Sequence, residues 1–152
     1  MTHADLVQHG VRWLRGRMKC RLVFAELSTS AWMIPDVIGW RMGSSVLLEC
    51  KRTRKDFFSD REKFAHKHER VPGKHRWYLT PPGLIKEHEV PAGWGLIEAR
   101  GRRTFTIVEA PKRVLTEQEH AEEALILTSA VSRLQTGRSQ YNPTTAKFTA
   151  WR

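Results

Sequence analysis

Two apolar runs separated by a short turn, within residues 34–51 (IPDVIGWRMGSSVLLECK), constrain the fold of this chain more than any other feature. The Gly43-Ser44 pair predicts a two-residue turn in which glycine comes first and supplies a positive φ. Counting outward from that turn pairs Asp36 with Lys51. The segment is therefore expected to form a β-hairpin that carries charged residues at its open end.

The charged residues of this hairpin are expected to share one face. Side chains alternate between the two faces of a strand, which puts Asp36, Glu49 and Lys51 together, with Glu49 opposite Ile38. Charges on an otherwise apolar hairpin are unfavourable unless they are paired or bind a cation. Carboxylate oxygens suit Mg²⁺ or Mn²⁺, and such an ion activates water and neutralises charge on a phosphate. Lys51 could orient the attacking water, and the alternative is a plain ion pair between Glu49 and Lys51.

Two further ligands are candidates for this site. Glu26 lies near the end of a strand expected over residues 21–27, and it becomes a third acidic ligand if that strand lies beside the strand of Asp36. An ordinary strand-end glutamate is the equal alternative. The main-chain carbonyl of Cys50 is the other candidate. Cys20 and Cys50 have no metal-binding spacing, which predicts two reduced thiols in a cytoplasmic protein and leaves a single disulfide as the alternative.

A net charge of +10 favours an anionic partner, nucleic acid before membrane. No apolar run approaches the roughly 20 residues that span a membrane. Basic residues follow the hairpin directly and could hold a DNA backbone, with RNA as the alternative, although a solvated helix face has a similar composition. These basic residues are Arg52, Arg54, Lys55, Arg61, Lys63 and Lys67.

The remaining elements follow from periodicity and from turn residues. Helices are expected over residues 2–18, 56–70 (with Asp56 as the N-cap) and 116–135 (with Thr116 and Glu119 as a capping box). Strands are expected over residues 75–80, 94–99 and 104–109. The apolar positions expected to pack the last helix on the core are Ala124, Leu127, Ala130, Val131 and Leu134.

Together these elements predict an α/β fold in which helices cover a mixed sheet. Residues 1–136 are expected to form one domain and residues 137–152 a basic tail. The tail could be disordered, could pack on the domain or could stack on bases.

The order of elements over residues 2–80, with Pro35 and Asp36 opening the second strand and Glu49 and Lys51 ending the third, resembles the PD-(D/E)XK nuclease superfamily. The resemblance implies a restriction-endonuclease-like core (αβββαβ), to which a strand pair and a C-terminal helix are added. It also implies that Asp36 and Glu49 bind Mg²⁺ or Mn²⁺ and that Lys51 is the catalytic lysine. Many nucleases of this fold act as homodimers.

A narrower resemblance, to the MmcB-like DNA repair proteins and related small phage and prokaryotic proteins, extends to about residue 112. The residues that carry it after Glu49 and Lys51 are Thr53, Arg54, Asp56, Phe57, Asp60 and Lys63, where Thr53 replaces the usual serine. The later stretches Tyr78-Leu79-Thr80-Pro81 and Gly93-Trp94-Gly95-Leu96-Ile97 are also similar. The superfamily often places a further acid on the first helix, where Asp5 is the candidate, so Asp5 competes with Glu26.

The sequence thus predicts a divalent-metal-dependent DNA endonuclease that hydrolyses phosphodiester bonds in DNA repair, recombination or phage DNA processing. The alternative is a non-catalytic nucleic-acid-binding or adaptor protein that retains the nuclease fold.

Overall fold

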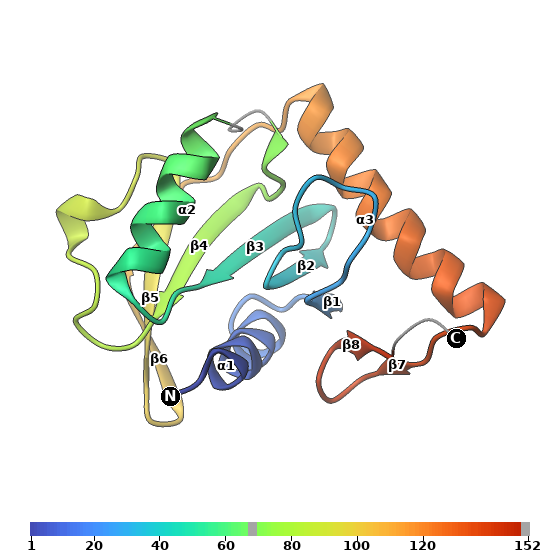
Figure 1. Ribbon diagram of the computed structural model, residues 1–152, viewed down its shortest axis with the longest axis horizontal. Coiled ribbons are helices and arrows are strands. Elements are labelled where there is room, and N and C mark those ends of the chain that lie inside the picture. Colours follow the sequence, from blue (N-terminus) through green and yellow to red (C-terminus); the bar gives the residue numbers. More distant parts are fainter. Residues whose placement is uncertain (67–69, 150–152) are drawn as a thin grey trace.

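A computed structural model describes residues 1–66 and 70–149 of the chain. Figure 1 shows a twisted central sheet with helices packed against it. The helices are α1 (His3–Gly16), α2 (Arg54–His66) and α3 (Glu117–Thr136), with a short 3₁₀ helix η2 (Glu87–Glu89). The strands are β1 (Leu22–Ala25), β2 (Val37–Arg41), β3 (Ser44–Cys50), β4 (His75–Thr80), β5 (Trp94–Arg100), β6 (Arg103–Val108), β7 (Tyr141–Asn142) and β8 (Lys147–Phe148).

The sheet is mixed, as the sequence predicts. Its six strands lie in the order β1-β2-β3-β4-β5-β6, and β7 pairs with β8 in a separate small sheet. Strands β1, β2 and β3 are antiparallel, β3, β4 and β5 are parallel, and β6 returns antiparallel to β5. Helix α2 makes the crossover that a parallel β3–β4 pair requires. The expected αβββαβ order, the added strand pair β5–β6 and the C-terminal helix are all confirmed.

The turn of the central hairpin is one residue earlier than predicted. Met42 and Gly43 are its two central residues, with φ values of 43° and 74°, and Arg41 pairs with Ser44. Positive φ at both positions is the pattern of a type I′ turn, whose twist matches that of the flanking strands. The prediction of Gly43-Ser44 was wrong because it assigned the first left-handed position to the glycine, whereas Met42 occupies it.

This earlier turn changes the pairing of the charged residues but preserves the face they share. Val37 lies opposite Leu48, so Asp36 lies opposite Glu49 and no longer opposite Lys51. The predicted pairs of Asp36 with Lys51 and of Ile38 with Glu49 are therefore wrong. Because the register differs from the predicted one by two positions, the alternation of faces is unchanged, and the three charged side chains lie on the face that α2 covers.

Helix α1 packs on the opposite face of the sheet from α2 and α3. Thr2 and Asp5 form a capping box at its N-terminus, where the Thr2 hydroxyl accepts from the Asp5 N–H at 3.1 Å. A Cβ atom at Gly10 would lie 2.4 Å from Cδ2 of Leu48. Glycine at this position therefore lets α1 approach β3 closely.

Helix α2 begins before the predicted cap. The Thr53 hydroxyl accepts from the Asp56 N–H at 3.1 Å, so Thr53 caps the first turn and the prediction of Asp56 was wrong. In the described residues, α2 runs from Arg54 to His66. Its expected end near residue 70 comes after residues 67–69, which are outside the described residues. The buried side chains of this helix, Phe57 and Phe64, fix it over the sheet.

Helix α3 has the predicted ends, with a capping box of Thr116 and Glu119 and a left-handed Gly137 at its C-terminus. The predicted apolar stripe was wrong for Ala124, Val131 and Leu134, which are exposed. The buried positions of α3 are Glu119, Glu122, Glu123, Ile126, Ala130 and Arg133. Charged groups occupy this face because they pair with residues on the segments against which α3 packs. A pattern of apolar residues cannot reveal such pairs.

Of the alternatives for the tail, the described part packs on the domain, next to β1 (Figure 1). The Tyr141 hydroxyl donates to the carbonyl of Val23 at 2.7 Å, and the N–H of Ala25 donates to the carbonyl of Ala146 at 2.8 Å. The ring of Phe148 stacks on Phe24. These contacts cover one edge of the sheet. Among the helices of residues 1–66 and 70–149, none is long and apolar enough to cross a membrane.

Candidate metal centre

Asp36 and Glu49 meet where the β2–β3 hairpin opens. Asp36 immediately precedes β2 and Glu49 lies near the end of β3. The main-chain N–H of Asp36 donates to Oε1 of Glu49 at 3.3 Å, and the N–H of Cys50 donates to Oδ2 of Asp36 at 2.7 Å. These bonds hold the two carboxylates side by side on the face beneath α2.

Lys51 joins the same cluster. Its Nζ donates to Oε2 of Glu49 at 3.2 Å and also contacts Oδ2 of Asp60 on α2. Asp60 was not among the predicted site residues, although it belongs to the motif that resembles the MmcB-like proteins. Only the packing of α2 over the sheet brings it to Lys51.

The cluster lies in a poorly solvated environment. Glu49 is 4% exposed and Lys51 is 7% exposed. Burial, and then the neighbouring charge of Asp36, raise the pKa of Glu49 to about 8, and burial also raises the pKa of Asp36. Burial opposes the charge on Lys51, but Glu49 and Asp60 outweigh it, so its pKa is raised.

The charges in this cluster are unbalanced when all groups are ionised. Three carboxylates, those of Asp36, Glu49 and Asp60, surround the single ammonium of Lys51. The excess of two negative charges is the charge that a divalent cation neutralises.

Glu26 and His3 border the cluster on the solvent side. Glu26 lies just after β1, and Nε2 of His3 is 3.4 Å from Oε1 of Glu26 and 3.4 Å from Oδ1 of Asp36. One potential ligand atom from each of the three lies within 4.8 Å of the others. Glu26 also contacts Lys147. Asp5, the competing acid, accepts hydrogen bonds from the N–H and the hydroxyl of Thr2.

The donor set fits a hard divalent cation. Asp36 and Glu49 offer carboxylate oxygens, and Glu26 is the acid next to Asp36. The thiol of Cys50 packs in the core on the α1 side, so only its main-chain carbonyl is a ligand candidate. Cys20 and Cys50 are both free and buried. His3 has no sequence signal, because it precedes Asp36 by a whole helix and strand.

The basic residues have different environments. Arg54 forms a bidentate pair with Glu89, with distances of 2.9 and 2.5 Å, and Arg61 lies over the ring of Phe58. Lys63 lies over the ring of Trp32. Arg52 and Lys55 are exposed. Lys67 is outside the described residues.

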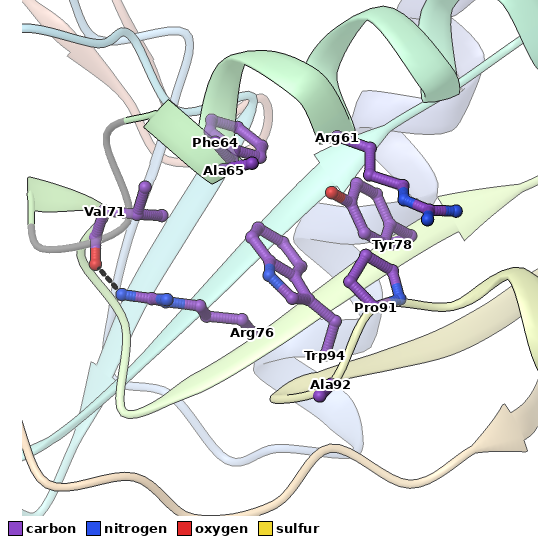
Figure 2. Close-up of a pocket in the computed structure, with 9 residues that line it drawn as sticks. All are labelled: Arg61, Phe64, Ala65, Val71, Arg76, Tyr78, Pro91, Ala92 and Trp94. Atoms are coloured by element: carbon purple, nitrogen blue, oxygen red, sulfur yellow. Dashed lines mark hydrogen bonds between the residues drawn. The ribbon is translucent and has the colours of Figure 1, made fainter.

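A cavity of about 210 Å³ lies between α2 and β4–β5 (Figure 2). Tyr78 and Trp94 form one wall, and Arg61 projects from α2 near Tyr78. Arg76, at the other end, is buried, contacts the carbonyl of Val71 and pairs with Glu119 at 2.6 Å. The guanidinium of Arg76 is therefore held by the protein itself.

Comparisons with known proteins support the fold but not an activity. No family model matches the chain, and no curated protein matches it. Among solved structures, the chain is similar to the SPO1766 protein of unknown function from Silicibacter pomeroyi, with 21% sequence identity and a TM-score of 0.65. The similarity covers 91% of this chain and 92% of that one.

Proposed function

We propose that this protein is a divalent-metal-dependent DNA endonuclease of the PD-(D/E)XK type, in which Asp36 and Glu49 hold Mg²⁺ or Mn²⁺. The observation that carries the proposal is the cluster of the half-buried Asp36 with the buried Glu49 and Lys51 on one face of the sheet. A buried Glu49 carboxylate next to the half-buried Asp36 is unfavourable without a cation, because Lys51 is shared with Asp60.

Each residue of the cluster has a defined task in this proposal. A bound ion would activate water and offset the charge that develops on the scissile phosphate. Asp36 and Glu49 hold the ion, with the carbonyl of Cys50 and the carboxylate of Glu26 as further ligands. Lys51 orients the attacking water, and Asp60 fixes the position of the Lys51 ammonium. The exposed cations Arg52 and Lys55 contact the phosphate backbone.

The biological setting that we propose is DNA repair, recombination or phage DNA processing. The resemblance of the Glu49–Lys63 segment to the MmcB-like proteins supports it. The two free, buried thiols, Cys20 and Cys50, support a reducing, cytoplasmic location.

The test is a plasmid-nicking assay of wild type and Asp36→Ala with Mg²⁺, Mn²⁺ or EDTA. Glu117→Gln, at an exposed glutamate on α3, is the matched control for loss of one negative charge. We expect metal-dependent nicking by wild type and by the control, and at least a 100-fold loss in Asp36→Ala. Cleavage by Asp36→Ala at the wild-type rate would refute the assigned site.

The second candidate is a non-catalytic nucleic-acid-binding or adaptor protein. The net charge of +10 favours it, and so does the contact of Lys51 with Asp60, which satisfies the amine without any substrate. This candidate predicts salt-sensitive DNA binding that persists in EDTA, with no nicking in either metal. Metal-dependent turnover that Glu49→Gln abolishes would exclude it.

A further inference from the structure

Tyr78 lies next to the acidic cluster. It pairs with Glu49 across the parallel β3–β4 ladder, and both side chains are on the face beneath α2. From the strand HRWYLT alone, core packing is the default expectation for Tyr78, and the alternative is that Tyr78 or Trp77 faces the substrate groove. Its position beside Glu49 follows from the register of two strands that are separated by a whole helix.

The ring of Tyr78 is held from two sides. Trp94 stacks on it at 4.4 Å between ring centroids, and Phe57 contacts it edge-on at 4.9 Å. Tyr78 is fully buried. Phenylalanine would provide the same ring packing, so the packing does not account for the hydroxyl.

The hydroxyl of Tyr78 has no hydrogen-bond partner among the described residues. Leaving a buried hydroxyl without a partner is unfavourable, and such a group calls for a specific explanation. Burial, together with the charges of Glu49 and Asp60, raises the pKa of this phenol. The hydroxyl is therefore a donor in a region rich in carboxylate acceptors.

The carboxylate of Glu49 still has room for another donor. In the described structure it accepts from the N–H of Asp36 and from Nζ of Lys51. An ionised carboxylate has about four acceptor sites. A metal ion would take one or two of these, and a neutral donor could take another without adding charge.

We propose that the Tyr78 hydroxyl is a positioning group of the metal centre, which donates to the Glu49 carboxylate when that carboxylate binds the ion. The inference rests on the proposed function, because it assigns Tyr78 a task in holding the same ion. Tyr78 has no direct part in the chemistry, and it acts by fixing the orientation of Glu49.

The chain offers a matched pair of variants, Tyr78→Phe and Tyr141→Phe. The Tyr141 hydroxyl donates to the carbonyl of Val23 and accepts from Arg15 at 3.2 Å, on the far side of β1 from Tyr78. Both substitutions remove one phenolic oxygen. Within the described residues, Tyr141→Phe removes the two hydrogen bonds of its hydroxyl, whereas Tyr78→Phe removes none.

Two measurements separate a structural from a functional hydroxyl. Urea unfolding in EDTA reports stability, and calorimetric titration with Mn²⁺ reports affinity without any need for catalysis. We expect Tyr78→Phe to be at least as stable as wild type and to bind Mn²⁺ about tenfold more weakly, which is the size of one hydrogen bond to a charged group. Tyr141→Phe should be less stable and should bind Mn²⁺ as wild type does.

Unchanged Mn²⁺ affinity in Tyr78→Phe would overturn the inference and leave the proposed metal centre intact. Destabilisation of Tyr78→Phe equal to that of Tyr141→Phe would also overturn it, because the hydroxyl would then have a structural partner. Absence of Mn²⁺ binding by wild type would refute the proposed function itself, and this inference with it.

Discussion

The buried carboxylate of Glu49 predicts an unusual pH dependence for the stability of the metal-free protein. Its pKa in the folded protein is about 8, against 4.5 as the ordinary value. Between these two pH values the unfolded chain has released the proton and the folded protein still holds it. Stability must therefore fall as pH rises through this window, because folding takes up a proton.

The size of the effect follows from the difference between the two pKa values. At about 1.4 kcal/mol for each tenfold change in proton affinity, the upper limit is about 5 kcal/mol. We expect about 1–3 kcal/mol, because small rearrangements let water reach the charged carboxylates. Glu49→Gln removes the titrating group and preserves the shape of the side chain.

The assay is urea unfolding, followed by tryptophan fluorescence in EDTA, of wild type and Glu49→Gln at pH 5.5 and pH 8.5. Between pH 5.5 and pH 8.5, the free energy of unfolding of wild type should fall by about 1–3 kcal/mol more than that of Glu49→Gln. Burial lowers the pKa values of His9 and His75, but these groups titrate in both proteins, so their contributions cancel in the difference. A difference between the proteins that stays constant with pH would refute the reasoning.

Two further predictions concern the core around β4 and β5. A Cβ atom at Gly95 would lie 2.4 Å from Cε3 of Trp77, so Gly95→Ala should lower the free energy of unfolding by about 1–3 kcal/mol, whereas Gly16→Ala, with open space around it, should change it little. Equal effects in urea unfolding would count against this packing. Glu119→Gln should lower the free energy of unfolding by about 3–5 kcal/mol, because it leaves the buried guanidinium of Arg76 without its charged partner. A negligible change in the same unfolding assay would contradict this prediction.

Much of the fold could be predicted from local patterns. The capping box of Thr116 and Glu119, the left-handed Gly137 and the strand pair around Gly101 all follow from residues that are close in the chain. The shared face of Asp36 and Glu49 also survived an error in the turn, because strand alternation has a period of two.

Other features depend on contacts between distant segments. The buried face of α3 was predicted only in part: Ala130 and Leu127 pack on the core. Glu119 and Glu122 were missed, because their arginine partners, Arg76 and Arg70, lie far away in the chain. A rule that places apolar residues inside cannot anticipate such pairs.

The order of the elements and the carboxylate pair of the hairpin follow from local patterns in the chain, because both depend on short-range periodicity. The groups that surround that pair depend on tertiary packing. The packing of α2 brings Asp60 to Lys51, the start of α1 brings His3 to Asp36, and the β3–β4 register pairs Tyr78 with Glu49. These contacts arise when helices and strands pack on a common sheet, and no spacing along the chain encodes them.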